Sequence, residues 1–296
     1  MKKYMQYGVI LFSVSLVFMG CEDLVGPLDS IDNITTKTLI PVDPPALPPA
    51  TANNVDRLLE QVEGNKEASK NLVNEIAKAI EKASEEDKKK LQQVATAAAV
   101  QATGVYDVVT GSAGELLETL TGDEGGEFAL NDAADLLQGL LNVPNTAELA
   151  DSLATIYGVP TETNGDITGL SLDGNGLEAD QDLKNTIQAI ADSGTSPDDL
   201  ALAGLALVLG GAGDTIPPNV KDNPDDLMAY LQDTTENGFA ASLANDDKPN
   251  LTPEMQMGLL LLAASTQSDE EGLIAGPIAD ALKGIPGFSG FFGNNE

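Results

Sequence analysis

Apolar residues recur at three- and four-residue steps along much of this chain, and that spacing limits its fold more than any other feature. One stripe holds Leu72, Ile76 and Ile80, and a second runs from Leu91 to Val109. A period of 3.6 residues places such positions on one face of an α-helix. Because only 4% of the residues are aromatic, these faces must bury Leu, Ile, Val and Ala. We expect an all-α fold of about ten helices in antiparallel hairpins, with a helical-repeat solenoid as the open alternative.

Several of the expected helices begin with residues that cap helix N-termini. Ser84 precedes three acidic residues, and Asn145 is followed by Glu148 in an arrangement like a capping box. Such side chains accept hydrogen bonds from backbone N–H groups that lack a partner in the first turn. Three later starts place a capping residue before a proline in the first turn: Ser196-Pro197, Asn223-Pro224 and Thr252-Pro253.

The helix after Pro197 is apolar on all sides from Ala201 to Val208, which predicts the central buried helix. The run Gly210-Gly211-Ala212-Gly213 predicts its end, since no Lys-Ser or Lys-Thr follows to make a phosphate loop. Residues 158–177 break the helical pattern with five glycines and a proline. We expect one irregular loop there, which is also the place for a sub-boundary in the domain. Three apolar residues in this loop predict either a short strand or a segment that anchors the loop to the core: Ile167, Leu170 and Leu172.

The same loop leads into a metal-binding pattern. Ser171, Asp173, Asn175, Gly176 and Asp182 stand at loop positions 1, 3, 5, 6 and 12. These spacings resemble the calcium loop of EF-hands, where alternating oxygen ligands wrap a hard cation around a glycine turn. The sequence differs from that family at position 1, which is serine, and at position 12, where aspartate has a shorter reach than glutamate. We expect a plain acidic loop and no cofactor, and a calcium site is the weaker alternative.

The chain is strongly acidic, with 15 Lys and Arg against 47 Asp and Glu and a formal net charge of -32. Such a surface repels nucleic acid, which is not an expected partner. It also repels anionic lipid headgroups, so charge does not hold the chain at a membrane. Seven cations fall between residues 66 and 90. They predict a solvated helix face, with a site for an acidic partner as the alternative. Two i,i+4 ion pairs are expected on this face, Glu85–Lys89 and Glu86–Lys90.

The sequence has no histidine, no tryptophan and one cysteine. Zinc sites built from Cys and His are excluded, as are nucleophiles activated by histidine. Paired carboxylates such as Asp198-Asp199 mostly stand at expected helix starts, where the helix dipole explains them. We expect no enzymatic activity; a hydrolase built on a carboxylate pair is the alternative.

The first 20 residues have the parts of a secretory signal. Lys2 and Lys3 precede an apolar run, residues 8–19, that is too short to span a bilayer as a helix. The single cysteine, Cys21, follows directly after the small residue Gly20.

The stretch Val17-Phe18-Met19-Gly20-Cys21 resembles the lipobox of bacterial lipoproteins, from which it differs at Phe18 and Met19. The resemblance implies that the signal is cut before Cys21, which then carries acyl chains. They would anchor the chain in the bacterial cell envelope, and the outer membrane is favoured over the inner. An ordinary secretory signal with an incidental cysteine is the alternative.

These features divide the chain into a signal (1–20), a lipidated N-terminus with a Pro-rich, semi-rigid tether (21–50), a helical domain (51–284) and a Gly/Phe tail (285–296). The tail is expected to fold back on the domain, and docking on a partner and disorder are the alternatives. We expect a non-enzymatic role in interaction, scaffolding or envelope assembly. The expected partners are the membrane, through Cys21, and an unidentified protein. The alternatives are a ligand-binding accessory component of a transport system and a surface adhesin or calcium-binding protein.

Overall fold

The computed structural model describes residues 47–105, 141, 143–173, 176–221 and 251–268, together with residues 223, 226, 230, 244–245, 248–249, 272 and 275. The signal, Cys21, the tether up to residue 46 and the tail at 285–296 lie outside the described residues. What the sequence predicts for those segments therefore stays a prediction.

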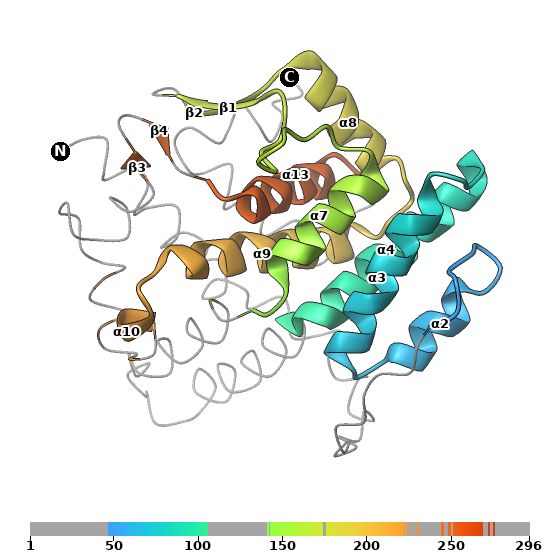
Figure 1. The fold of residues 1–296 in the computed structure, drawn as a ribbon. Helices are drawn as coiled ribbons and strands as arrows, with labels where there is room; N and C mark the ends of the chain where they lie inside the picture. Colours follow the sequence, from blue (N-terminus) through green and yellow to red (C-terminus); the bar gives the residue numbers. More distant parts are fainter. Residues whose placement is uncertain are drawn as a thin grey trace, which may run out of the picture.

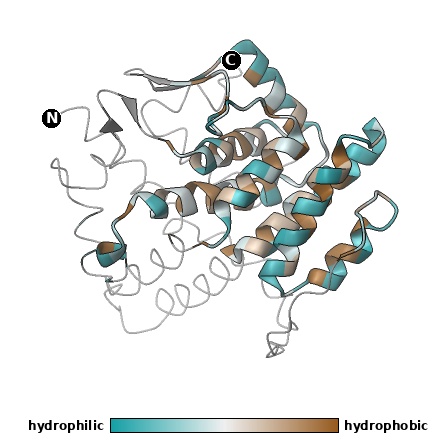
Figure 2. Ribbon diagram, in the orientation of Figure 1, coloured by the Kyte–Doolittle hydropathy of each residue, from teal (hydrophilic) through white to brown (hydrophobic). Residues whose placement is uncertain are grey.

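Helices dominate the described part of the chain, so the all-α prediction is confirmed there. Its eight helices are α2 (Val55–Val62), α3 (Lys66–Ile80), α4 (Glu85–Thr103), α7 (Thr146–Tyr157), α8 (Gln181–Ala191), α9 (Pro197–Thr215), α10 (Pro218–Lys221) and α13 (Pro253–Gln267). Two antiparallel hairpins accompany them, β1 (Leu170–Asp173) with β2 (Gly176–Ala179) and β3 (Ala244–Asn245) with β4 (Lys248–Pro249). In Figure 2, hydrophobic and hydrophilic residues alternate along α2, α3 and α4, as expected for helices with one buried face.

Two helices that are buried along most of their length form the centre of the described fold. Every residue of α9 from Leu200 to Leu207 is buried, which confirms the predicted central helix, and α13 is buried from Met255 to Ser265. Figure 1 shows α9 and α13 side by side, with α3 and α4 paired next to them and α2 at the edge. No helix in the described ranges is both long and apolar enough to cross a membrane.

The backbones of α9 and α13 meet at two glycines. A Cβ added to Gly204 would stand 2.7 Å from the carbonyl oxygen of Gly258, and a Cβ added to Gly258 would stand 2.6 Å from that of Gly204. Both distances are shorter than real Cβ atoms tolerate. The two helices can therefore lie this close only while both positions lack a side chain.

The run Gly210-Gly211-Ala212-Gly213 does not end α9, which continues to Thr215. The prediction of a helix end there is wrong, because these glycines lie in the helix and provide room for its neighbours. A Cβ on Gly210 would overlap the side chain of Thr146 at the start of α7, and one on Gly213 would overlap the carbonyl oxygen of Leu141.

Two of the predicted caps are confirmed. The side chain of Ser84 accepts a hydrogen bond from the backbone N–H of Asp87 at the start of α4, and Thr252 does the same for Met255 in α13. Asp180 caps α8 in the same way, at a helix start that the sequence had not predicted. These bonds satisfy donors that a helix start would otherwise leave without a partner.

The predicted capping box at the start of α7 is wrong. Asn145 stands at the N-cap position with a φ of 65°, yet its side chain makes no cap bond. Its Oδ1 accepts a hydrogen bond from Lys70 at 3.4 Å, and the same ammonium group binds Glu148. Ser196, the predicted cap of α9, makes no side-chain cap bond either.

The expected irregular loop contains the β1–β2 hairpin, so the strand predicted from Leu170 and Leu172 is confirmed. The chain before it is held on the core through α13. Ile167 is buried, and its backbone N–H donates to Oε1 of Gln256 at 2.7 Å. Nε2 of Gln256 donates to Oδ1 of Asp166 at 2.8 Å. One amide therefore fixes the loop to the central helix pair.

Candidate functional site

An open groove lies between residues 49–52 and the turn that joins α3 to α4. Its volume is about 370 Å³. Apolar groups form its floor: Ala50 and Leu91 are buried, and Ala79 and Ala83 pack against the core. One wall of the groove is thus formed by the last two residues of the predicted tether and the first two of the domain.

Asn54 fixes that wall. Its Oδ1 accepts a hydrogen bond from the Thr51 backbone N–H at 2.8 Å, and its Nδ2 donates to the Pro49 carbonyl oxygen at 3.1 Å. Val55 and Leu58 follow at once and are fully buried, which attaches α2 to the core. The groove therefore has a defined shape on the side where the chain enters the domain.

Charged side chains of both signs line the groove. Nζ of Lys78 lies 2.7 Å from Oε1 of Glu75, and Oδ2 of Asp87 accepts a hydrogen bond from the Ser84 hydroxyl at 2.9 Å. Lys82 is exposed and forms no ion pair with any described residue. An incoming group would therefore meet an apolar floor and one lysine that has no carboxylate partner among the described residues.

The lysines of α4 pair differently from the prediction. The predicted pairs Glu85–Lys89 and Glu86–Lys90 do not form, because Lys89 and Lys90 bind acceptors elsewhere on the chain. The observed contacts are Lys88 to Glu85 at 2.7 Å, Lys90 to Asp56 at 2.6 Å and Lys89 to the carbonyl oxygen of Asp192 at 3.0 Å. Exposed ion pairs of this kind contribute about 0–1 kcal/mol each. Their presence favours the interpretation of a solvated helix face.

Lys70 is the most enclosed cation of the described ion pairs, with its side chain 12% exposed. Its Nζ lies 2.8 Å from Glu67 on its own helix and 3.1 Å from Glu148 on α7. The hydrogen bond to Glu67 is the main cause that raises the pKa of Lys70, and burial opposes it. The hydrogen bond from Lys70 is the main cause that lowers the pKa of Glu148. The cluster joins α3 to α7, and no local sequence signal connects its members.

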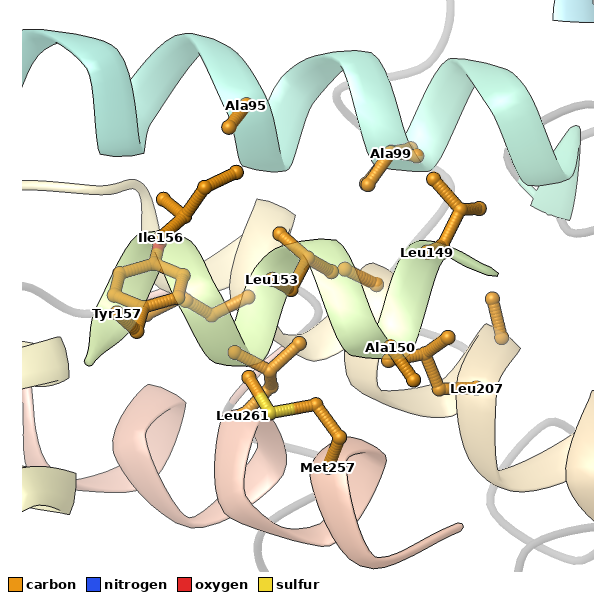
Figure 3. Packing of buried hydrophobic residues seen from close by; sticks show 14 of the residues in the cluster. Ala95, Ala99, Leu149, Ala150, Leu153, Ile156, Tyr157, Leu207, Met257 and Leu261 are labelled. Atoms are coloured by element: carbon orange, nitrogen blue, oxygen red, sulfur yellow. The ribbon is translucent and has the colours of Figure 1, made fainter. Parts of the chain in front are cut away.

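A chain of buried hydroxyl groups crosses the core. The Tyr157 hydroxyl lies 2.7 Å from that of Thr96 and 3.1 Å from that of Thr195, which is 2.8 Å from the Ser193 hydroxyl. Burial is the main cause that raises the pKa of Tyr157, so the phenol stays neutral. Figure 3 shows Tyr157 at one end of α7, which lies between Ala95 of α4 and the side chains of α13. The network links α4, α7 and the α8–α9 connection; sequence reasoning missed it because its members are far apart in the chain.

The carboxylate pair at the start of α9 holds its two members in different surroundings. Oδ1 of Asp198 accepts a hydrogen bond from the Ala275 backbone N–H at 3.0 Å, which brings a distant segment to this helix end. Asp199 is half-buried, and burial, followed by repulsion from Asp198, raises the pKa of its carboxyl group. The dipole of α9 explains why acids stand here, and the contact with Ala275 gives Asp198 a structural role.

The candidate calcium ligands lie on the β1–β2 hairpin and on α8. Ser171 is exposed in β1 opposite Glu178, Asp173 is paired with Gly176, and Asp182 is exposed in the first turn of α8. Asn175 lies outside the described residues. Within the described part of the chain, no three or more His, Cys, Asp and Glu side chains come together as a metal site. Calcium binding by this segment stays a prediction.

The chain was compared with protein-family models, with curated proteins and with solved structures. No protein-family model, no curated protein and no solved structure matches it.

Proposed function

We propose that this chain is a non-enzymatic interaction lipoprotein of the bacterial cell envelope. Acyl chains on Cys21 hold it at a membrane, the Pro-rich tether spaces the domain from the lipid, and the helical domain binds a protein partner. The lipobox-like stretch Val17–Cys21 supports the anchor. More than one acyl chain is needed for stable attachment, as the lipoprotein pattern supplies.

The open groove beside residues 49–52 is the observation that carries the binding role. It is open to the surface, and its lining includes the apolar residues Ala50, Ala79 and Leu91. Its wall is held by Asn54 and its floor belongs to the core, so a partner would meet a preformed shape. Preformed sites lose less conformational entropy on binding than flexible ones.

The anchor is tested by metabolic labelling with palmitate. The wild-type chain is expected to incorporate label and to remain with the membrane fraction. The Cys21→Ala variant is expected to lose both properties, while a Lys82→Ala variant, altered far from the lipobox, keeps them. Label that persists in Cys21→Ala would contradict the anchor.

The groove is tested by site-specific photo-crosslinking in cells. A crosslinking residue at position 82, beside the groove, is compared with one at position 89 and one at Ala189, which is exposed on α8. We expect one protein adduct of defined mass from position 82 alone, and we expect Ala79→Glu to abolish it by filling the groove with a charged side chain. Equal adducts at all three positions, or an adduct that survives Ala79→Glu, would overturn the assignment of the groove. Failure in this experiment leaves the anchor standing, because palmitate labelling tests it separately.

A further inference from the structure

We draw no further inference here: the strongest candidate, the open groove between residues 49–52 and the α3–α4 turn, belongs to the site already described, and with lysines and carboxylates both lining it nothing in the structure shows the chemistry of what covers it.

Discussion

Substitution of Gly258 by alanine tests the close approach of α9 and α13. The added Cβ would stand 2.6 Å from the carbonyl oxygen of Gly204 and 2.8 Å from the backbone nitrogen of Val208. Ordinary van der Waals contact begins at 3.4 Å, so the helices must separate locally by about 0.8 Å. A change of side-chain rotamer cannot relieve a contact with backbone atoms.

The size of the effect follows from two opposing terms. Forcing a methyl group into a well-packed core costs about 1–3 kcal/mol, and the backbone contacts place Gly258→Ala at the upper end. Alanine in a helix is more favourable than glycine by about 1 kcal/mol, which offsets part of that cost. We expect a net loss of about 2 kcal/mol in the free energy of unfolding.

The assay is urea unfolding followed by circular dichroism, on the chain from residue 21 with Cys21→Ser so that no acyl chain is attached. An unchanged slope with a lower midpoint reports a loss of stability alone. Ala189→Gly on the exposed face of α8 is the matched control for helix propensity, with an expected loss of about 1 kcal/mol.

A double variant tests whether backbone atoms, and not the Val208 side chain, limit the approach of the two helices. Val208→Ala removes the side-chain methyl group that lies 2.8 Å from the added Cβ, but it leaves the backbone nitrogen in place. We therefore expect Val208→Ala to give no rescue of Gly258→Ala. Full rescue, or a Gly258→Ala protein as stable as the wild type, would refute the view that the two backbones limit the approach.

Four further outcomes follow from the polar contacts. Lys70→Met should lower the unfolding free energy by about 2 kcal/mol, because charged hydrogen bonds are lost; Lys78→Met, which loses an exposed pair, should change it by less than about 1 kcal/mol. Tyr157→Phe should cost about 1–3 kcal/mol, since buried hydroxyl groups lose a partner; an unchanged melting temperature would contradict this. Asp199→Asn should raise the melting temperature at pH 7, because the raised pKa means that ionisation of this carboxyl group weakens the fold. That gain should vanish below the ordinary aspartate pKa of 3.8, where the wild-type group is protonated in both states; a gain that persists in acid would argue for another cause. Calorimetric titration with calcium separates the plain acidic loop, which should give no heat at millimolar calcium, from the EF-hand-like alternative, in which Asp173→Asn and Asp182→Asn should weaken binding.

The parts of the fold that sequence reasoning predicts correctly depend on neighbours in the chain. The buried stripe of α3 and the caps Ser84 and Thr252 involve residues within a few positions of one another. The strand at Leu170 is likewise a local feature, marked by glycines on both sides. Helix period and cap chemistry act over these short distances, so a single sequence contains them.

The predictions that were wrong involve residues that are far apart in the chain. Asn145 stands in a good capping position, but its side chain accepts a hydrogen bond from Lys70, which lies 75 residues away in sequence. Lys90 pairs with Asp56 in place of a carboxylate one turn away. The glycines of α9 have the composition of a helix end, and only the positions of Thr146 and Leu141 reveal their packing role. The groove joins residues 49–52 to residues 75–91, which no motif connects.

The burial of α9 from Leu200 to Leu207 has a consequence for amide hydrogen exchange. Backbone N–H groups exchange with solvent when a local or global opening exposes them, and the slowest ones report the opening of the whole structure. The residues from Leu200 to Leu207 have no solvent face, and their neighbour α13 is itself enclosed. Their amides should therefore be the last to acquire deuterium in the described part of the chain, while those of α2, at the edge of the fold, should exchange early.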